Sequence, residues 1–382
     1  MSEKKKPVVR FDGFTDDWEQ RKVTEVGKIY IGLVTTMTNH YTSEGNLLIR
    51  NSDIKDGYFE FGENPIYLEK SFAEENYTRM HQVGDVITVH TGDVGTSAVI
   101  TENEANSIGF ATIVTRPNPK IIDSNYLATF LNTEQHKRWA ISISTGDGRT
   151  NYNLGDYYEL VIPVPNIDEQ KKIAEYIKSL NTLITLCQRK CDKLKNVKKS
   201  MLEKMFPKNG CRVPEIRFAG FTDDWEQRKL GEVVQITMGQ SPDGSTYSDV
   251  PSDYVLVQGN ADLENGWVKP RVWTTQITKQ AVVGDLIMSV RAPAGAMGKT
   301  AYNTVIGRGV AAIKGNEFIY QLLIKMDKEG YWKKDSTGST FESLNSESIK
   351  NAELKIPSED EQNRIGKYFE NLDNLITLHQ RE

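Results

Sequence analysis

Several features are scarce or missing in this 382-residue sequence, and each absence narrows the class of protein. There are only three cysteines, Cys187, Cys191 and Cys211, which are too few for a disulfide framework and typical of a reducing compartment. No apolar run approaches the roughly 20 residues that a membrane-spanning helix needs. The charged start Met1–Pro7 lacks the apolar segment of a secretory signal. We therefore expect a cytoplasmic protein with no membrane partner.

An excess of charge of one sign is also missing. The 47 lysines and arginines against 52 aspartates and glutamates give a formal net charge of -5. This balance argues mildly against a protein that coats nucleic acid without sequence preference, although it permits local basic patches. The composition, 38% hydrophobic and 26% charged, is that of a folded globular protein. A chain of this length predicts two or three domains.

The chain contains a long internal repeat. The block Phe11–Lys22 recurs as Phe218–Lys229, and the only difference is Asp12 against Ala219. Twelve aligned positions with a tryptophan and one mismatch do not arise by chance, so the two halves of the chain are copies of one unit.

A second repeat closes each half. Asp168–Ile173 matches Asp360–Ile365, and Leu183–Arg189 matches Leu375–Arg381. Between the repeated blocks the sequence has diverged, and only a skeleton of shared positions remains. These positions are Gly84–Ile87 against Gly284–Ile287, Gly109–Ile113 against Gly309–Ile313, and Ser144–Gly146 against Ser336–Gly338. We interpret this pattern as two domains of one fold, each of which binds something different.

The second repeat begins a helical connector. Apolar residues spaced four and three apart form one seam, which predicts a long helix in a coiled coil. The first seam consists of Ile173, Ile177, Leu180, Ile184, Cys187, Cys191, Leu194, Met201 and Met205. The second consists of Ile365, Phe369, Leu372, Ile376 and His379. Two such helices would pack most simply against each other as an antiparallel coiled coil, with the second helix shorter.

The diverged domains consist mainly of short β-type runs separated by Gly, Pro, Asn and Ser, with a few helices between them. The sequence thus predicts an α+β protein with a pseudo-twofold internal repeat: two mixed α/β recognition domains separated by long helices. The expected boundaries are 1–160 and 210–353 for the domains, and 161–209 and 354–382 for the spacer helices.

Polar and basic residues in the loops of these domains are candidates for nucleic-acid contacts. Arg, Asn and Gln suit hydrogen bonds to base edges, and Lys suits phosphates. An ordinary surface role stays open for each of them. The candidates are Arg50, Asn51, Thr91, Arg149, Asn151, Gln240, Ser241, Lys269, Arg271, Arg291, Lys299 and Arg308.

Two segments come close to catalytic motifs without completing them. Ala296–Thr300 ends like a phosphate-binding loop, but Pro293 stands where the motif needs its first glycine. Asn64–Tyr67 approaches the Asn-Pro-Pro-Tyr signature of amino-methyltransferases, but its third position is isoleucine. An ordinary turn is therefore the favoured interpretation of Asn64–Tyr67.

No metal site is expected either. Cys187 and Cys191 lack further ligands at suitable spacing and are interpreted as core residues of the seam. Glu169–Lys171 resembles the end of a metal-nuclease motif but lacks its upstream acid. We interpret it as the start of a helix, with Asp168 or Asp360 near the cap.

With these features together, the chain resembles the specificity (S) subunit of type I restriction-modification systems. This family opens each half with a Phe-x-Gly-Phe-x-x-x-Trp-type block, here Phe11–Trp18 and Phe218–Trp225. It enters each helix through an Ile-Pro…Glu-Gln segment, here Ile162–Gln170 and Ile356–Gln362. The resemblance covers the whole chain, and the short second helix is the departure from it.

The resemblance implies a DNA sequence-recognition subunit with no catalytic site and no cofactor of its own. It implies two methyltransferase (M) subunits as partners, which use S-adenosylmethionine to methylate adenine, and restriction (R) subunits that use ATP and Mg²⁺. Because the two domains differ in sequence, we expect a bipartite, asymmetric target in double-stranded DNA. The alternative is a coiled-coil interaction scaffold whose variable domains bind proteins.

Overall fold

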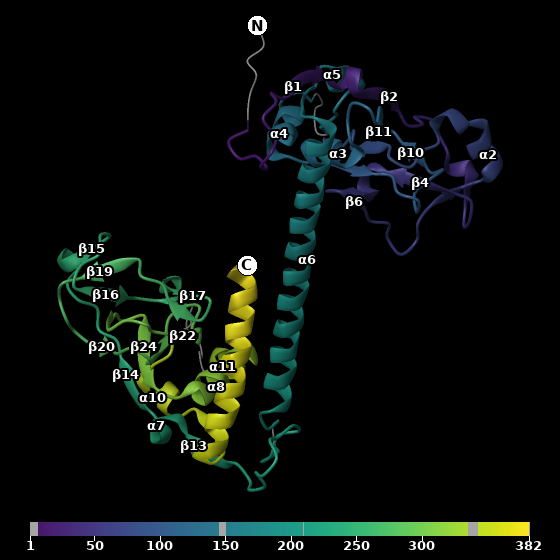
Figure 1. Cartoon of the computed structure of the whole chain (residues 1–382). Helices are drawn as coiled ribbons and strands as arrows, with labels where there is room; N and C mark the ends of the chain where they lie inside the picture. Colours follow the sequence, from purple (N-terminus) through teal and green to yellow (C-terminus); the bar gives the residue numbers. More distant parts are fainter. Residues whose placement is uncertain (1–6, 145–149, 209, 335–342, 382) are drawn as a thin grey trace. The chain divides into compact units, whose positions relative to one another are not determined.

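The computed structural model describes residues 7–144, 150–208, 210–334 and 343–381. The chain divides into two compact units, residues 1–183 and 184–382 (Figure 1). Both units contain mixed sheets and short helices, so the predicted α+β class is confirmed. Among the described helices, none is both long and apolar enough to cross a membrane.

The first unit contains two four-stranded sheets. Its strands are β1 (Glu19–Lys22), β2 (Gly27–Ile31), β3 (Tyr41–Thr42), β4 (Asn46–Arg50), β5 (Ile54–Lys55), β6 (Tyr58–Phe59), β7 (Tyr67–Leu68), β8 (Val86–Thr88), β9 (Ser97–Val99), β10 (Ile108–Phe110), β11 (Ile113–Pro117) and β12 (Val161–Val164). One sheet has the order β2-β11-β8-β9 and is antiparallel. The other has the order β10-β4-β7-β3, in which β10 and β4 run parallel.

Helices cover one face of the antiparallel sheet. The helices of this unit are α1 (Val23–Val26), α2 (Lys70–Glu75), α3 (Ser124–Leu131), α4 (Glu134–Ile143) and α5 (Leu154–Tyr158). Successive side chains of a strand point to opposite faces. Accordingly Val86 and Ile113 join the core that includes residues of α3, while Ile87 and Val114 join a second core on the other face. The β8 strand is therefore apolar on both faces.

The second unit repeats this plan. Its strands are β13 (Glu226–Lys229), β14 (Gln235–Met238), β15 (Tyr247–Ser248), β16 (Tyr254–Val257), β17 (Leu263–Glu264), β18 (Trp267–Val268), β19 (Val272–Thr274), β20 (Gln280–Ala281), β21 (Leu286–Ser289), β22 (Met297–Lys299), β23 (Thr304–Ile306), β24 (Val310–Lys314) and β25 (Glu353–Ile356). The sheet orders are β14-β24-β21-β22-β18-β17 and β15-β19-β16-β23-β20. Its helices are α7 (Leu230–Val233), α8 (Glu317–Lys328), α9 (Tyr331–Lys334), α10 (Ser346–Lys350) and α11 (Glu359–Arg381).

The register of the sheets corrects one alignment made from sequence. In the first unit Thr115 pairs with Val86, and in the second Ile313 pairs with Leu286. Ile313 therefore corresponds to Thr115, and Gly109 corresponds to Gly307 instead of Gly309.

The corrected pairing explains why these glycines recur. A Cβ atom on Gly32 would collide with the carbonyl oxygen of Gly109, and one on Gly239 would collide with that of Gly307. Each unit thus brings two backbones together at a point where only glycine fits. The third predicted match, Ser144–Gly146 against Ser336–Gly338, lies largely outside the described residues.

In each unit, the strand that leads into the domain pairs with the strand that leads out of it into the long helix. Strand β1 pairs with β12, and β13 pairs with β25 in the same way. Beside these strands, the Arg10 guanidinium donates through Nε and Nη2 to the two carboxylate oxygens of Glu169, at 2.7 and 2.8 Å. Arg217 makes the same two bonds to Glu361, both at 2.7 Å. Glu169 and Glu361 are fully buried, so each arginine compensates a charge that water cannot reach.

The first turn of the long helix is held by hydrogen bonds to residues outside the helix. The first long helix is α6 (Ile167–Lys204). Its cap is Asn166, whose side chain accepts from the Glu169 backbone N–H, and Asp168 lies in the first turn, near the cap as predicted. Gln170 is buried and bonds to Asp123 N and to the carbonyl oxygens of Ile121 and Pro165. The repeated Glu-Gln pair therefore joins helix and domain.

Within the second unit, α11 runs antiparallel to the end of α6. Lys198 of α6 donates to both carboxylate oxygens of Asp373, at 2.6 and 2.8 Å. The ring centroids of Phe206 and Phe369 lie 6.0 Å apart. Gln321 of α8 also donates to Asp373, and α8 packs along α11 (Figure 1). A three-helix junction therefore forms around one carboxylate.

The predicted seam is buried only in part. Ile365, Phe369, Leu372 and Ile376 are buried, and Leu194 and Met201 pack against the same core. Ile173 instead packs against the core of the first unit. Ile177 is half-buried, Leu180 is 37% exposed and Ile184 is 51% exposed. A seam residue is buried only where a neighbouring element covers it, and a continuous coiled coil along α6 stays a prediction.

The paired charges at the helix starts predict a large and specific loss of stability. Arg217→Ala should lower the free energy of unfolding by about 3 kcal/mol, because it leaves the buried Glu361 carboxylate uncompensated. Arg228→Ala is the matched control, since Arg228 pairs with Glu232 at the surface, and it should cost at most about 1 kcal/mol. Urea unfolding of the full chain measures both. Equal losses for the two variants would contradict the assigned role of the pair.

Two histidines of the first unit are buried as neutral rings. His81 is 1% exposed and lies 2.8 Å from Ser107 Oγ. His136 is 2% exposed, and its Nδ1 lies 2.6 Å from the carbonyl oxygen of Leu131, to which it must donate. Its Nε2 can then accept from the Tyr152 hydroxyl. Burial lowers the pKa of each histidine to about 4.

These pKa values predict that stability falls with acidification. The unfolded chain binds a proton at each histidine below about pH 6.5, while the folded chain binds it only near pH 4. Between pH 8 and pH 5 each histidine should therefore cost about 2 kcal/mol. Urea unfolding across this range measures the loss. His136→Gln should make it smaller. A loss unchanged in His136→Gln would disprove the assignment.

Candidate nucleic-acid interface

A turn of the form Asn-x-Asp follows the same strand in both units. In the first unit it is the 3₁₀ turn Asn51–Asp53 after β4, and in the second it is Asn260–Asp262 after β16. Asp53 is 3% exposed and Asp262 is 7% exposed. Both carboxylates accept backbone N–H groups from just before the turn, so the aspartate fixes the shape of the turn in each domain.

In the first domain the turn gathers several of the predicted residues. Asn51 Oδ1 accepts from the His90 backbone N–H at 2.8 Å. Thr91 Oγ1 donates to Asn151 Oδ1 at 2.9 Å, and the backbones of Thr91 and Asn151 form a β-bridge. Arg50 stands immediately before the turn. Four residues expected to contact DNA from separate loops thus lie in one cluster, whereas Arg149 lies outside the described residues.

The second domain uses the same positions with different side chains. Arg291 follows β21 as Thr91 follows β8, and it forms the equivalent β-bridge with Ser343. Beside it a depression of about 500 Å³ is lined by Gln258, Asn260, Arg271 and Pro293, among other residues. Arg271 and Arg291 were predicted from sequence. Gln258 and Asn260 were missed, although the recurrence of Asn-x-Asp after an apolar strand would have revealed Asn260.

A further group of predicted residues adjoins this depression. The Arg308 backbone N–H donates to Ser241 Oγ at 3.1 Å. Gly307 lies between the side chains of Ser241 and Gln258, which also lines the depression. The turn at Gln240 is held by Thr278, whose hydroxyl donates to the Gln240 carbonyl oxygen. Gln240, Ser241 and Arg308 therefore belong to the same end of the domain.

The two predicted lysines are placed differently. Lys269 pairs with Glu264 at 2.8 Å, and both side chains are 54% exposed, so Lys269 can still reach a phosphate. Lys299 donates to Glu317 at 2.9 Å and lies 4.9 and 4.8 Å from the ring centroids of Trp267 and Tyr320. Its side chain is only 15% exposed. The geometry therefore weighs against Lys299 as a DNA contact.

The segments that approach catalytic motifs are parts of sheets. Met297–Lys299 is the strand β22, and the buried Thr300 donates its hydroxyl to the Tyr302 carbonyl oxygen. A phosphate-binding loop would have to curl around its ligand there and lead into a helix. In the first domain, Ile66 accepts a backbone bond from Leu48 beside β7. Neither segment has the geometry of the motif that it approaches.

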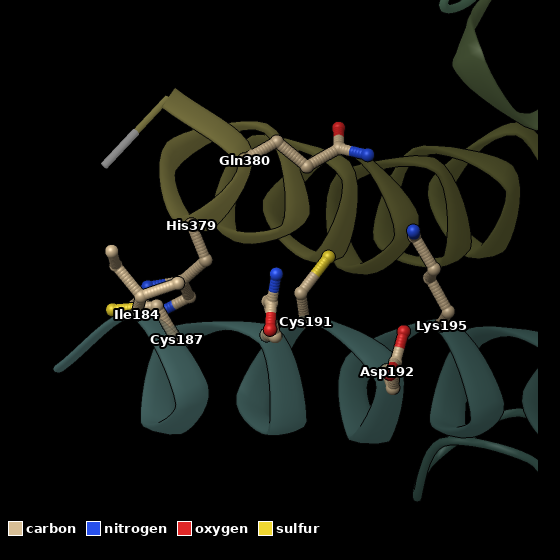
Figure 2. Close-up of a pocket in the computed structure, with 8 residues that line it drawn as sticks. Ile184, Cys187, Cys191, Asp192, Lys195, His379 and Gln380 are labelled. Carbon is tan, nitrogen blue, oxygen red and sulfur yellow. The ribbon is translucent and has the colours of Figure 1, made fainter. Parts of the chain in front are cut away.

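The cysteines of α6 lie in a depression of about 510 Å³ between α6 and α11. Figure 2 shows His379 directed toward Ile184 and Cys187, and Cys191 directed toward α11. In the described part of the chain, no three His, Cys, Asp or Glu residues gather closely enough to hold a metal ion. The depression is therefore a gap in helix packing, with His379 in the seam where the first copy has Cys187.

Known proteins show the same organisation along the whole chain. A sequence model described as type I restriction modification DNA specificity domain matches residues 15–196 and again residues 222–382. The putative type I restriction enzyme MjaX specificity subunit of Methanocaldococcus jannaschii is 26% identical over 96% of this chain and 89% of its own length. The EcoBI specificity subunit of Escherichia coli is 25% identical over 43% of this chain and 35% of its own length.

Solved structures agree with this organisation at the level of the fold. The type I restriction-modification S subunit from M. genitalium has a TM-score of 0.63 at 13% identity, and the match covers 97% of this chain and 92% of that one. A chain from a study of assembly and conformational transition of the type I system has a TM-score of 0.52 at 23% identity, covering 96% and 93%. Each of the two family matches covers one copy of the recognition fold, and the chain belongs to the type I restriction-modification DNA specificity family, which supplies sequence recognition and not catalysis.

Proposed function

We propose that this chain reads a bipartite, asymmetric sequence in double-stranded DNA, one half with each domain. The main support is that the same end of both domains carries polar and basic side chains of different kinds. Thr91 and Arg291 hold equivalent positions, and so do Asn151 and Ser343. Because hydrogen-bonding groups of different geometry select different bases, two such surfaces favour two different half-sites. The protein-binding scaffold has no comparable support.

The proposal includes the partners that the resemblance implies. Two methyltransferase subunits would methylate adenine with S-adenosylmethionine, and restriction subunits would supply ATP- and Mg²⁺-dependent cleavage. The cofactors would belong to those subunits, and this chain would hold none of them. A DNA target and three cysteines that form no disulfide also suit the cytoplasm. The modest net charge of -5 fits an arrangement in which partners provide part of the grip on the phosphates.

Methylation mapping tests the proposal directly. The full chain is co-expressed with the methyltransferase subunit of its own system, and adenine methylation is mapped by single-molecule sequencing. We expect a motif with two defined parts and a fixed gap. Arg291→Ala should weaken recognition of one part by about 10-fold and leave the other unchanged. Arg228→Ala, on the connector, should leave both parts unchanged. Methylation without any motif, or equal loss at both parts, would overturn the proposal.

Lys299 provides a further test because the geometry separates it from the other basic candidates. Lys299→Ala should lower the free energy of unfolding by about 1–2 kcal/mol, since it removes a charged hydrogen bond and contacts with two aromatic rings. The methylated motif should be unchanged, because the ammonium group faces Glu317 within the domain. Unfolding in urea and motif mapping at a temperature where the variant is folded measure the two effects. A changed motif would place Lys299 at the DNA.

A further inference from the structure

Both domains hold an arginine against the buried aspartate of the Asn-x-Asp turn. Arg50 donates through Nε to Asp53 Oδ2 at 3.0 Å and through Nη2 to Asp53 Oδ1 at 2.8 Å. Arg271 donates through Nη1 to the Ala261 carbonyl oxygen at 3.0 Å, and this nitrogen lies 3.7 Å from Asp262 Oδ1. The hydrogen bonds to Asp53 also raise the pKa of Arg50 above its ordinary value.

The two arginines reach equivalent aspartates from different places in the sequence. Arg50 directly precedes its turn, at the position where the second domain has Gly259. Arg271 comes from the segment between β18 and β19, after the turn. The turn and its aspartate are therefore common to both domains, while the arginine that they hold is not. An arrangement reached by two routes in one chain is a feature of the fold and not of one local sequence.

Both guanidinium groups keep an open edge. The side chain of Arg50 is 39% exposed and that of Arg271 is 51% exposed. Asp53 occupies the Nε–Nη2 edge of Arg50, which leaves Nη1 and the second Nη2 proton. For Arg271, no hydrogen bond to Nε or Nη2 occurs among the described residues, and its side chain lines the depression with Gln258 and Asn260. Each arginine thus presents two parallel N–H groups from a fixed position.

A guanidinium edge with two parallel N–H groups matches O6 and N7 of guanine in the major groove. An arginine that is already oriented loses less side-chain entropy on binding than a free one. We infer that Arg50 and Arg271 each read a guanine in their own half-site, and that Asp53 and Asp262 are the positioning residues that orient them. This inference rests on the proposed function and specifies the identity of one base in each half-site.

The competing explanation is that each arginine only compensates the charge of a buried aspartate. The two explanations differ for lysine. A lysine at position 50 or 271 supplies the compensating charge but cannot form two parallel hydrogen bonds to guanine. If compensation is the whole role, Arg50→Lys behaves like the unchanged chain in every assay. If the arginine reads a base, Arg50→Lys keeps its stability and loses discrimination at one position.

The experiment is a selection from a pool of random duplex DNA by the full chain in complex with its methyltransferase. We expect a guanine in each half of the selected motif. Arg50→Ala and Arg50→Lys should each reduce the preference for guanine in one half by about 10-fold, and Arg271→Ala and Arg271→Lys should do so in the other half. Arg138→Ala, an exposed arginine on α4, is the control and should leave the motif unchanged.

Replacing the selected guanine by 7-deazaguanine, which lacks only the N7 acceptor, should weaken binding of the unchanged chain. It should have little further effect on the arginine variants. Asp53→Asn and Asp262→Asn keep an oxygen for the turn but lose the ion pair, and each should broaden the preference at the same position as its arginine. Melting curves check that these variants are folded.

The outcomes separate the inference from the proposed function. If the unchanged chain selects no motif, the proposed function fails and the inference fails with it. If it selects a two-part motif that the arginine variants leave intact, or one without guanine in a half-site, only the inference is overturned for that domain. An equal loss of affinity for all duplexes would identify a phosphate contact, which also overturns it.

Discussion

The buried Arg10–Glu169 and Arg217–Glu361 pairs are the joints on which the rest of each unit depends. Each joins the segment that enters a recognition domain to the first turn of the helix that leaves it. Because the glutamates are shielded from water, only the correctly placed arginine can compensate their charge, and the geometry of the joint is tightly defined. The strand pairs β1–β12 and β13–β25 lie beside these joints and align the same two segments.

This joint explains why the connectors are nearly identical while the domains have diverged. In the connectors, Arg217 and Glu361 depend on each other through two hydrogen bonds, and the adjacent Gln362 donates to the Pro357 carbonyl oxygen, so a change in this segment affects several bonds. The loops at the other end of the domain also contain hydrogen bonds, such as Thr91–Asn151, but the side chains at these positions differ between the two domains. The glycine pair and the aspartate of the turn are common to both domains there, while the side chains around them differ. Different DNA sequences can thus be read from one scaffold.

The same scaffold explains why some segments resemble catalytic motifs without forming catalytic sites. Gly298 and Lys299 of the second domain lie on strand β22, which pairs with β21, and Thr300 directly follows it. Glu169 of the Glu-Gln segment is buried, and both of its carboxylate oxygens accept hydrogen bonds from Arg10. A residue type that suits catalysis has a structural task in each case. This agrees with a family whose contribution is sequence recognition.

The sequence by itself determined the duplication, the class of fold, the two long helices and the family, because these depend on repeats and periodicities that the chain displays directly. It also singled out Asn51, Thr91, Asn151 and Arg291 as candidates for DNA contacts, since loops after strands favour polar side chains, and the structure places Thr91 and Arg291 at equivalent positions of the two domains. Only the tertiary structure decided that Gly109 corresponds to Gly307, that Ile173 belongs to a domain core, and that Lys299 is used internally. These facts depend on strand register and on packing between residues distant in sequence, which no local pattern contains. The buried aspartates that hold Arg50 and Arg271 were hidden for the same reason: an aspartate in a loop suggests solvent until the fold closes over it.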